Sequence, residues 1–322
     1  MLTEKKRREL IDKLTTPTKR IDAVLDTDAY NEIDDQFAIS YMLACPERIN
    51  ILAFYAAPFH NSNSSGAADG MERSYNEIKK LLTLSHNEKY LPLTYRGSTE
   101  YLPNETTPIE SDAARDLVRL ANGHTEEDPL YVVAIGAITN VASALLLDPT
   151  IVDRIVIVWL GGHAHFTREE IAAEGFSGPR HPAGEFNMRQ DIAAARVVFN
   201  SGAPVVQLPC CGVVDRFAID KQGLTDALSG KNELCDYLLS HSISQADRDS
   251  KGAAWRRVIW DVTAVAWLTN DGDRFMHGRI TAAPIPEYDR TYSFDSTRNP
   301  ICYVDEIKVE ALFGELFGRI TK

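Results

Sequence analysis

The sequence predicts an α/β fold, an open and mostly parallel sheet with helices on both faces and helical additions in the C-terminal third. Short runs of β-branched and other apolar residues alternate with amphipathic segments, which is typical of strands buried on both faces. The chain has 322 residues, 44% hydrophobic and 25% charged, as in ordinary globular proteins. No internal repeat or low-complexity linker divides it, so we expect a single domain over residues 1–322.

The expected strands and helices follow one another along the first two thirds of the chain. The strands, each a mostly apolar run, are residues 21–25, 49–56, 130–135, 155–160 and 204–208. The helices, each with apolar residues at helical spacing, are residues 34–44, 72–84, 139–147 and 191–199. Ligands bind at the carboxyl ends of the strands in such sheets. Irregular stretches at 28–33, 58–69 and 161–185 each follow a strand, so we expect them to meet at one edge.

The rest of the chain departs from this alternation. After about residue 215 the pattern is mainly helical, with one helix expected at 258–268 and a closing helix at 304–320. Residues 280–295 carry prolines and short strand-like pieces, which favour an edge hairpin. The charged N-terminus is expected to form a short amphipathic surface helix.

Composition and charge argue against several classes of function. With 46 acidic and 34 basic residues, the net charge is −12, a poor match to a nucleic-acid backbone, so no nucleic-acid partner is expected. Apolar runs such as 155–160 are too short to span a bilayer. Five cysteines without C-x-x-C spacing favour free thiols in a reducing compartment. The N-terminus lacks the apolar core of a signal peptide, so we expect a cytoplasmic location.

The densest group of functional side chains is the run Asp-Thr-Asp-Ala-Tyr-Asn-Glu-Ile-Asp-Asp at residues 26–35, between a strand and a helix. Carboxylates this close repel one another in a partly dry site, and a hard divalent cation such as calcium or magnesium removes that repulsion. The alternative is helix capping, in which Asp34 caps the helix and Asp35 interacts with its dipole. Capping leaves Asp26 and Asp28 unexplained, so we favour a metal site.

This Asp-x-Asp, short loop and Asp-Asp resembles the N-terminal signature of the inosine-uridine preferring nucleoside hydrolases. Further motifs of that family follow in order. They are Gly-Ala-Ile-Thr-Asn-Val-Ala at 136–142, the strand end Gly161-Gly162, Gly-Glu-Phe-Asn at 184–187 and Trp-Asp-Val-Thr-Ala-Val at 260–265. Each is weak alone, but the ordered set is specific and spans roughly residues 21–268. The resemblance implies a nucleoside hydrolase-like, Rossmann-like fold and calcium-dependent hydrolysis of the N-glycosidic bond of a ribonucleoside.

The resemblance implies one Ca²⁺ at the bottom of the pocket, held by Asp28, Asp35, Asp261 and the main-chain carbonyl of Ile135. The cation would hold the nucleophilic water and lower its pKa, and Asp28 would complete the deprotonation as the catalytic base. Asp26 would not bind the cation itself but would orient the residues that do. For Asp261 the alternative is a helix N-cap, but the motif around it favours a ligand.

The resemblance also implies residues that bind the sugar. Asp34 would bind the ribose 2′-hydroxyl, and Glu185 and Asn187 would hold the 5′- and 3′-hydroxyls. Asn61 matches the family's asparagine after the second strand, with Asn63 as a competitor. The hydroxyls position the sugar, and the surrounding carboxylates stabilise its oxocarbenium-like transition state. Without the other motifs, the Glu-Phe-Asn run would be interpreted as an exposed loop.

The sequence departs from the family in three places. The loop between the aspartate pairs, residues 29–33, is two residues longer and lacks Pro-Gly, and its Glu32 would either enter the pocket or face solvent. Arg180 and His181 stand where the family has another asparagine, and an arginine there would suit an anionic group on the ligand. Trp260 replaces the histidine with which many members protonate the leaving base.

Purine-preferring members of the family have a tryptophan at the position of Trp260 and stack it on the base. Stacking would raise the basicity of a purine, so Trp260 is a candidate catalytic residue and purines are slightly favoured. A core tryptophan is the alternative. His163, His165 and His181 are alternative acids, because histidine titrates near neutral pH, although a surface or structural histidine is more common.

Two other functions fit part of the sequence. A haloacid dehalogenase-type phosphatase also begins with Asp-x-Asp after its first strand and uses magnesium, but it does not predict the Asp34-Asp35 helix start together with Glu-Phe-Asn and Trp-Asp. A non-catalytic relative would keep the fold to bind a sugar or nucleoside, but the intact acidic run favours catalysis. The expected partner is a small-molecule nucleoside or related glycoside, with no membrane partner. The resemblance also suggests a homo-oligomer, either a dimer or a tetramer.

Overall fold

The computed structural model describes residues 4–173, 181–251 and 253–322, which fold around an eight-stranded sheet of order β3-β2-β1-β4-β5-β6-β12-β9. The strands are β1 Ile21–Thr27, β2 Ile49–Ala56, β3 Thr94–Arg96, β4 Leu130–Ala134, β5 Ile155–Leu160, β6 Val205–Leu208, β9 Met276–Ala282 and β12 Pro300–Ile307. Neighbouring strands are parallel except β12 and β9, which are antiparallel. The predicted α/β fold with a mostly parallel sheet is confirmed.

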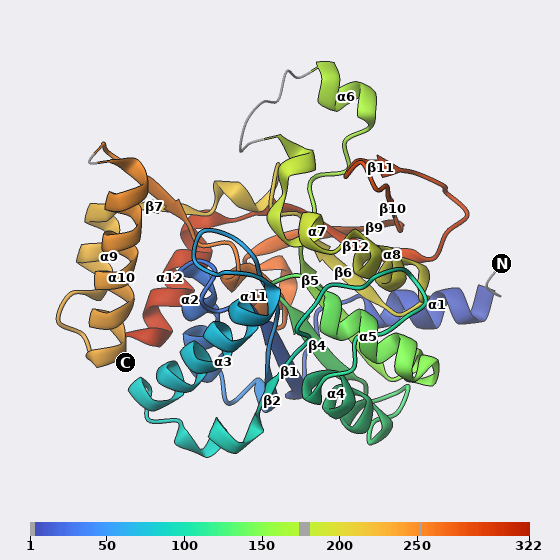
Figure 1. Cartoon of the computed structure of the whole chain (residues 1–322), viewed down its shortest axis with the longest axis horizontal. Coiled ribbons are helices and arrows are strands. Elements are labelled where there is room, and N and C mark those ends of the chain that lie inside the picture. Colours follow the sequence, from blue (N-terminus) through green and yellow to red (C-terminus); the bar gives the residue numbers. More distant parts are fainter. Residues whose placement is uncertain (1–3, 174–180, 252) are drawn as a thin grey trace.

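Helices cover both faces of the sheet, because successive strand residues point to opposite sides (Figure 1). In β1, Leu25 belongs to the core on one face and Val24 to the core on the other. The first face is covered by α2 Asp34–Leu43, α3 Ala67–Leu84, α11 Val262–Trp267 and α12 Val309–Ile320. The second face is covered by α4 Asp112–Asn122, α5 Thr139–Leu147 and α8 Ile192–Asn200.

The C-terminal third adds structure around this framework, as expected. The helices α9 Lys221–Leu228 and α10 Glu233–Ser250 pack together at one side of the molecule (Figure 1). Beside them, β7 Ala218–Asp220 and β8 Arg256–Val258 form an antiparallel pair. The remaining helices are α1 Glu4–Lys13, α6 Arg168–Ala173 and α7 Phe186–Gln190. In the part of the chain that the structure describes, no helix is both long and apolar enough to cross a membrane.

Several predicted boundaries were wrong. The expected closing helix at 304–320 begins only at Val309, because Pro300–Ile307 is the strand β12 inside the sheet. Its apolar residues follow one another continuously, and a short run of this kind does not distinguish a buried strand from a helix. The helix expected at 258–268 begins at Val262, and α3 begins at Ala67, earlier than expected.

The hairpin expected at 280–295 is present in a different form. The strand β9 continues to Ala282 at the edge of the main sheet, and β10 Ile285–Pro286 then pairs with β11 Tyr292–Ser293. The strand β3 and the helix α4 were not singled out by the sequence pattern.

The carboxyl ends of β1, β2 and β4 lie side by side at one edge of the sheet. The backbone N–H of Ala57 donates to Thr27 O, and that of Ile135 donates to Asp26 O, so the chain leaves all three strands at one level. The loop 28–33 and the first turn of α2 follow β1 directly. This edge therefore gathers the residues that the acidic motif and the glycine turn contribute.

Candidate functional site

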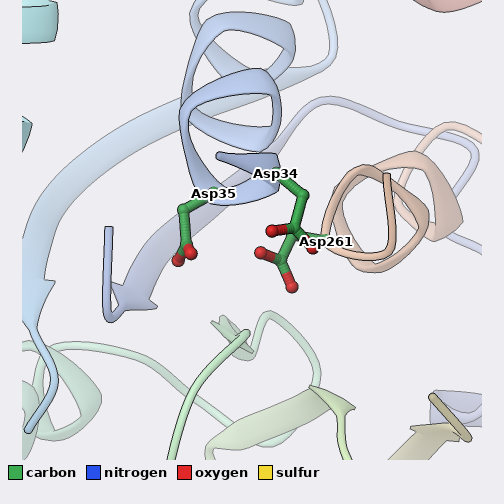
Figure 2. A group of neighbouring side chains, drawn as sticks. All are labelled: Asp34, Asp35 and Asp261. Carbon is green, nitrogen blue, oxygen red and sulfur yellow. The ribbon is translucent and has the colours of Figure 1, made fainter. Parts of the chain in front are cut away.

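Three buried carboxylates meet where two helices begin at this edge (Figure 2). Asp34 and Asp35 are the first residues of α2, and Asp261 directly precedes α11, which packs against α2. One carboxylate oxygen from each lies within 4.8 Å of the others. Asp261 is more than two hundred positions from Asp34 and Asp35 in the sequence, and the packing of α2 on α11 brings it beside them.

Helix capping does not explain these aspartates. Ile33, not Asp34, occupies the N-cap position of α2, and no side chain caps that helix. Asp261 occupies the N-cap position of α11 but makes no side-chain capping hydrogen bond. Side-chain capping therefore does not account for these carboxylates, although Asp34 and Asp35 lie in the first turn of α2, where the helix dipole favours acidic residues.

Asp28 lies beside this group and is also buried. Neither of its carboxylate oxygens has a hydrogen-bond partner, although both are shielded from solvent. Burial raises the pKa of Asp28 well above its usual value, and the charges of Asp35 and Asp34 raise it further. Gly136 provides the space for this side chain, because a Cβ there would lie 2.9 Å from the Asp28 carboxyl carbon. A buried carboxylate without a partner is costly unless a cation or a proton compensates it.

The carboxylates of the group share one electrostatic environment. Burial, followed by the charges of the neighbouring aspartates, raises the pKa of Asp35 and Asp261 well above the usual value. Burial and the charge of Glu32 raise the pKa of Asp34 to about 7, against the opposing effect of Arg257. Without a cation, protons are the species that relieve the repulsion. A hard divalent cation with oxygen ligands fits the same donor set.

Asp26 lies near the end of β1, two residues before Asp28. The Asn140 side-chain amide donates to Asp26 Oδ1 at 2.7 Å, and the other oxygen is buried without a partner. Burial raises the pKa of Asp26 to about 7. The next residue, Thr27, donates its hydroxyl to Asp35 Oδ1 at 2.5 Å. The end of β1 thus fixes the position of Asp35 directly.

The carbonyl of Ile135 and the side chain of Asn187 meet at the same edge. Asn187 Nδ2 donates to Ile135 O at 3.1 Å and to Leu160 O at 3.0 Å. Both protons of the amide are used in this way, so Oδ1 is the atom with which Asn187 would accept a proton from a hydroxyl. The structure therefore brings the glycine-turn strand and the Glu-Phe-Asn motif together.

Glu185 connects the end of β5 to the start of α7. Its Oε2 accepts from the backbone N–H of Gly162 and Met188, each at 2.8 Å, and its Oε1 accepts from that of Asn187 at 2.9 Å. The side chain is buried at the N-cap of α7, not exposed on a loop. This capping also fixes the backbone of Asn187.

Asn61 and Asn63 both contact the loop that follows β1. Asn61 Nδ2 donates to Asn31 Oδ1 at 2.5 Å, and Asn63 Nδ2 donates to Asn31 O at 2.9 Å. Both side chains are half-buried. Both asparagines therefore lie beside the loop 28–33 and contact it through Asn31.

Trp260 lies half-buried between the core and the site, and its indole N–H donates to Cys210 O at 3.3 Å. Two candidate acids have fixed partners, the buried His163 and the half-buried His165. His163 contacts the Ala164 carbonyl, and His165 contacts Gln207. Burial lowers the pKa of both histidines, to about 4 for His165, so both are neutral at pH 7.

His181 and Arg180 complete the residues named from the sequence. His181 Nδ1 accepts from the backbone N–H of Ala183 at 3.1 Å and caps the short helical turn Pro182–Gly184. Arg180 lies outside the described residues.

Two residues near the site were missed by sequence reasoning. Tyr101 donates its hydroxyl to Gln190 Oε1 at 2.6 Å, and the charge of Asp28 contributes, after burial, to raising its pKa. Arg257 is buried and forms an ion pair with Glu32 at 3.1 Å. Neither residue lies in a motif. The only available signal was that Arg257 stands three positions before Trp260.

Comparison with known families gives one extensive match. The family model described as inosine-uridine preferring nucleoside hydrolase matches residues 23–311. This range includes every site residue named above.

Individual relatives match more locally. The inosine-uridine preferring nucleoside hydrolase of Leishmania major is 33% identical over 109 residues, which is 33% of this chain and 31% of the relative. A probable uridine nucleosidase of Arabidopsis thaliana is 31% identical over 143 residues, 44% of this chain and 40% of the relative. These matches thus span less than half the length of each relative.

The fold is shared over nearly the whole chain. A solved plant nucleoside hydrolase superposes with a TM-score of 0.73 at 19% identity, covering 95% of this chain and 99% of the other. At this identity the likeness establishes the architecture, and the function has to be argued from the site.

Proposed function

The chain belongs to the inosine-uridine preferring nucleoside hydrolase family, and from this premise we propose that it hydrolyses the N-glycosidic bond of a ribonucleoside to free base and ribose. The observation that carries the proposal is the buried, unpartnered carboxylate of Asp28 beside the clustered carboxylates of Asp34, Asp35 and Asp261. A buried arrangement of this kind is costly for stability, which favours a functional origin.

We propose Ca²⁺ as the cofactor, held by Asp28, Asp35, Asp261 and the carbonyl oxygen of Ile135. The all-oxygen donor set, the unpartnered oxygens of Asp28 and the raised pKa values of the aspartates support this choice. When bound, such a cation lowers the pKa of a coordinated water and orients it.

The residues of the chain then divide the remaining tasks. Asp28 accepts the proton of the attacking water. Asp26, which the Asn140 side-chain amide holds in place, acts on the neighbouring Asp28 through its charge. The ribose hydroxyls are held by Asp34, Asn61, Glu185 and Asn187. Positive charge develops on the sugar in the transition state, and the surrounding carboxylates stabilise it.

For the leaving base we propose stacking on Trp260 and a slight preference for purines. The position of Trp260 directly before Asp261 and its half-buried indole support this assignment. His163 and His165 are poor proton donors at neutral pH because their pKa values are lowered. The purine would therefore take its proton from solvent water, and the electron pair of the broken N-glycosidic bond would stay on the protonated base.

We further propose a cytoplasmic homo-oligomer, either a dimer or a tetramer. The odd number of cysteines, all of them free thiols, supports a reducing compartment. The molar mass in solution, measured by light scattering, tests the oligomeric state.

The first test is release of ribose from a panel of purine and pyrimidine nucleosides with Ca²⁺ present. We expect turnover of at least one nucleoside. Substitution of Asp28 by Ala should reduce it by at least about a thousandfold, because one change removes a metal ligand and the base. A folded Asp28→Ala protein that retains full turnover would contradict the assignment.

The alternatives give different outcomes in the same experiment. Binding of Ca²⁺ without turnover of any nucleoside would favour a binding protein or an enzyme for another glycoside. Magnesium-dependent release of inorganic phosphate from phosphate esters would favour the haloacid dehalogenase-type phosphatase.

A further inference from the structure

The group of carboxylates is assembled from two chain segments that repel each other. One segment, residues 28–35, contributes Asp34 and Asp35, and the other, residues 256–261, contributes Asp261. Like charges within 4.8 Å in a buried site favour separation of the two segments when no cation is present. The packing of α11 on α2 holds the two helices together, and an attractive contact beside the carboxylates would further fix the register of the two segments.

One ion pair connects the same two segments directly beside the carboxylates. Arg257 Nη2 lies 3.1 Å from Glu32 Oε2, and Arg257 Nη1 lies 3.6 Å from Asp249 Oδ2 at the end of α10. The Arg257 side chain is only 10% exposed, whereas that of Glu32 is 41% exposed. Glu32 stands two residues before Asp34, and Arg257 stands four residues before Asp261.

Other contacts of the loop lie on its opposite side. Asn31 contacts Asn61 and Asn63, which follow β2, and the Arg73 guanidinium from α3 lies 5.6 Å from the centre of the Tyr30 ring. These contacts attach the loop to β2 and α3 but not to the segment that carries Asp261. Both charges of the ion pair act on the group itself, since Glu32 raises the pKa of Asp34 and Arg257 lowers it.

We propose that the Glu32–Arg257 ion pair is a positioning device that holds the two halves of the metal site together and so preorganises them for the cation. This inference rests on the proposed Ca²⁺ site. Glu32 belongs to the loop 28–33, which carries Asp28 and leads directly into Asp34. Neither residue is catalytic, because both act through the aspartates.

A positioning role and a purely electrostatic role predict opposite signs for one variant. Arg257 is a cation, so its removal should strengthen Ca²⁺ binding if only its charge matters. If the ion pair holds the segments together, removal of Arg257 should weaken binding. Removal of Glu32 weakens binding in both cases. The Arg257 variant is therefore the decisive one.

The test is calorimetric titration of the full chain with CaCl₂ alone, without substrate. We expect Glu32→Gln and Arg257→Gln each to weaken binding by about tenfold, in the range typical of groups that support metal ligands. Arg257→Lys, which keeps the charge and a shorter ion pair, should bind more tightly than Arg257→Gln. The exchange Glu32→Arg with Arg257→Glu should recover part of the loss.

The matched control is Arg48→Gln, which breaks the ion pair with Asp271 and should leave Ca²⁺ affinity unchanged. Circular dichroism confirms that each variant is folded. Unchanged or tighter binding by Arg257→Gln overturns the inference while the proposed function stands. Failure of the wild-type protein to bind Ca²⁺ overturns the proposed cofactor instead.

Discussion

At the scale of single residues, substitution of Trp260 distinguishes a role in the core from a role at the site. Its indole N–H is anchored on Cys210 O, and one part of the side chain packs against the core. Stacking of a base on an aromatic ring contributes about 1–3 kcal/mol. We expect Trp260→Ala to lower kcat/KM for purine nucleosides by roughly 5- to 150-fold, and for pyrimidine nucleosides by much less.

Trp260→Phe separates stacking from packing, because it retains a ring. It should restore most of the activity on purines. Steady-state kinetics on one purine and one pyrimidine nucleoside measure the difference. An equal loss on both substrate classes, together with reduced thermal stability, would mean that Trp260 serves the core alone.

Some residues of the candidate site could be predicted from the sequence, and others could not. Asp28, Asp35 and Asp261 were predicted because each lies in a recognisable motif, and the structure places their carboxylates close together. Arg257 was not found, because an arginine on a three-residue strand has no local pattern. Its ion pair with Glu32 depends on the packing of β8 beside the loop 28–33. Contacts of this kind depend on tertiary packing, which motif order does not encode.

At the scale of secondary-structure elements, Glu185 holds the short helix α7 to the end of β5. Three backbone N–H groups donate to its carboxylate, including that of Gly162, whose φ of +78° suits glycine. Removing the acceptor leaves these donors unsatisfied. We expect Glu185→Ala to lower the free energy of unfolding by about 1–3 kcal/mol and to impair substrate binding through Asn187.

Urea unfolding and steady-state kinetics measure these two effects. Ser111→Ala is the matched control, because Ser111 caps α4 through Ala114 N at a distance from the site. The control should lose about 1 kcal/mol of stability and keep its KM. An unchanged free energy of unfolding for Glu185→Ala would show that the cap contributes nothing.

The elements themselves were predictable where the sequence pattern is long. The strands that become β1, β2, β4, β5 and β6 are mostly apolar runs, and each was expected within a few residues of its bounds. The last four residues of β12, 304–307, were mistaken for the start of a helix, because an amphipathic start to α12 fits the same residues. Its place in the sheet depends on pairing with β6 and β9, which are distant in sequence.

At the scale of the whole molecule, the acidic site couples stability to pH. The usual pKa of an aspartate is 3.8, but burial raises the pKa of Asp26 and Asp34 to about 7 in the folded protein. Between these values the folded state binds more protons than the unfolded state, so the free energy of unfolding falls as pH rises. This stability is fully present below about pH 4 and is lost as pH rises through about 7.

Calcium should reverse this trend, because it binds the ionised carboxylates that protons otherwise occupy. Binding to the folded state alone adds about 2.7 kcal/mol at a free concentration of a hundred times Kd. We therefore expect the gain in Tm on adding CaCl₂, relative to EGTA, to be small near about pH 5 and larger near about pH 7.5. In EGTA, the contribution of these aspartates to stability should decrease over the same interval.

Asp261→Asn removes one of the repelling carboxylates and a proposed ligand, so it should flatten the pH dependence in EGTA and reduce the gain in Tm from calcium. A gain in Tm that is equal at both pH values, or unchanged in Asp261→Asn, would show that these carboxylates are not the groups that exchange protons for the cation.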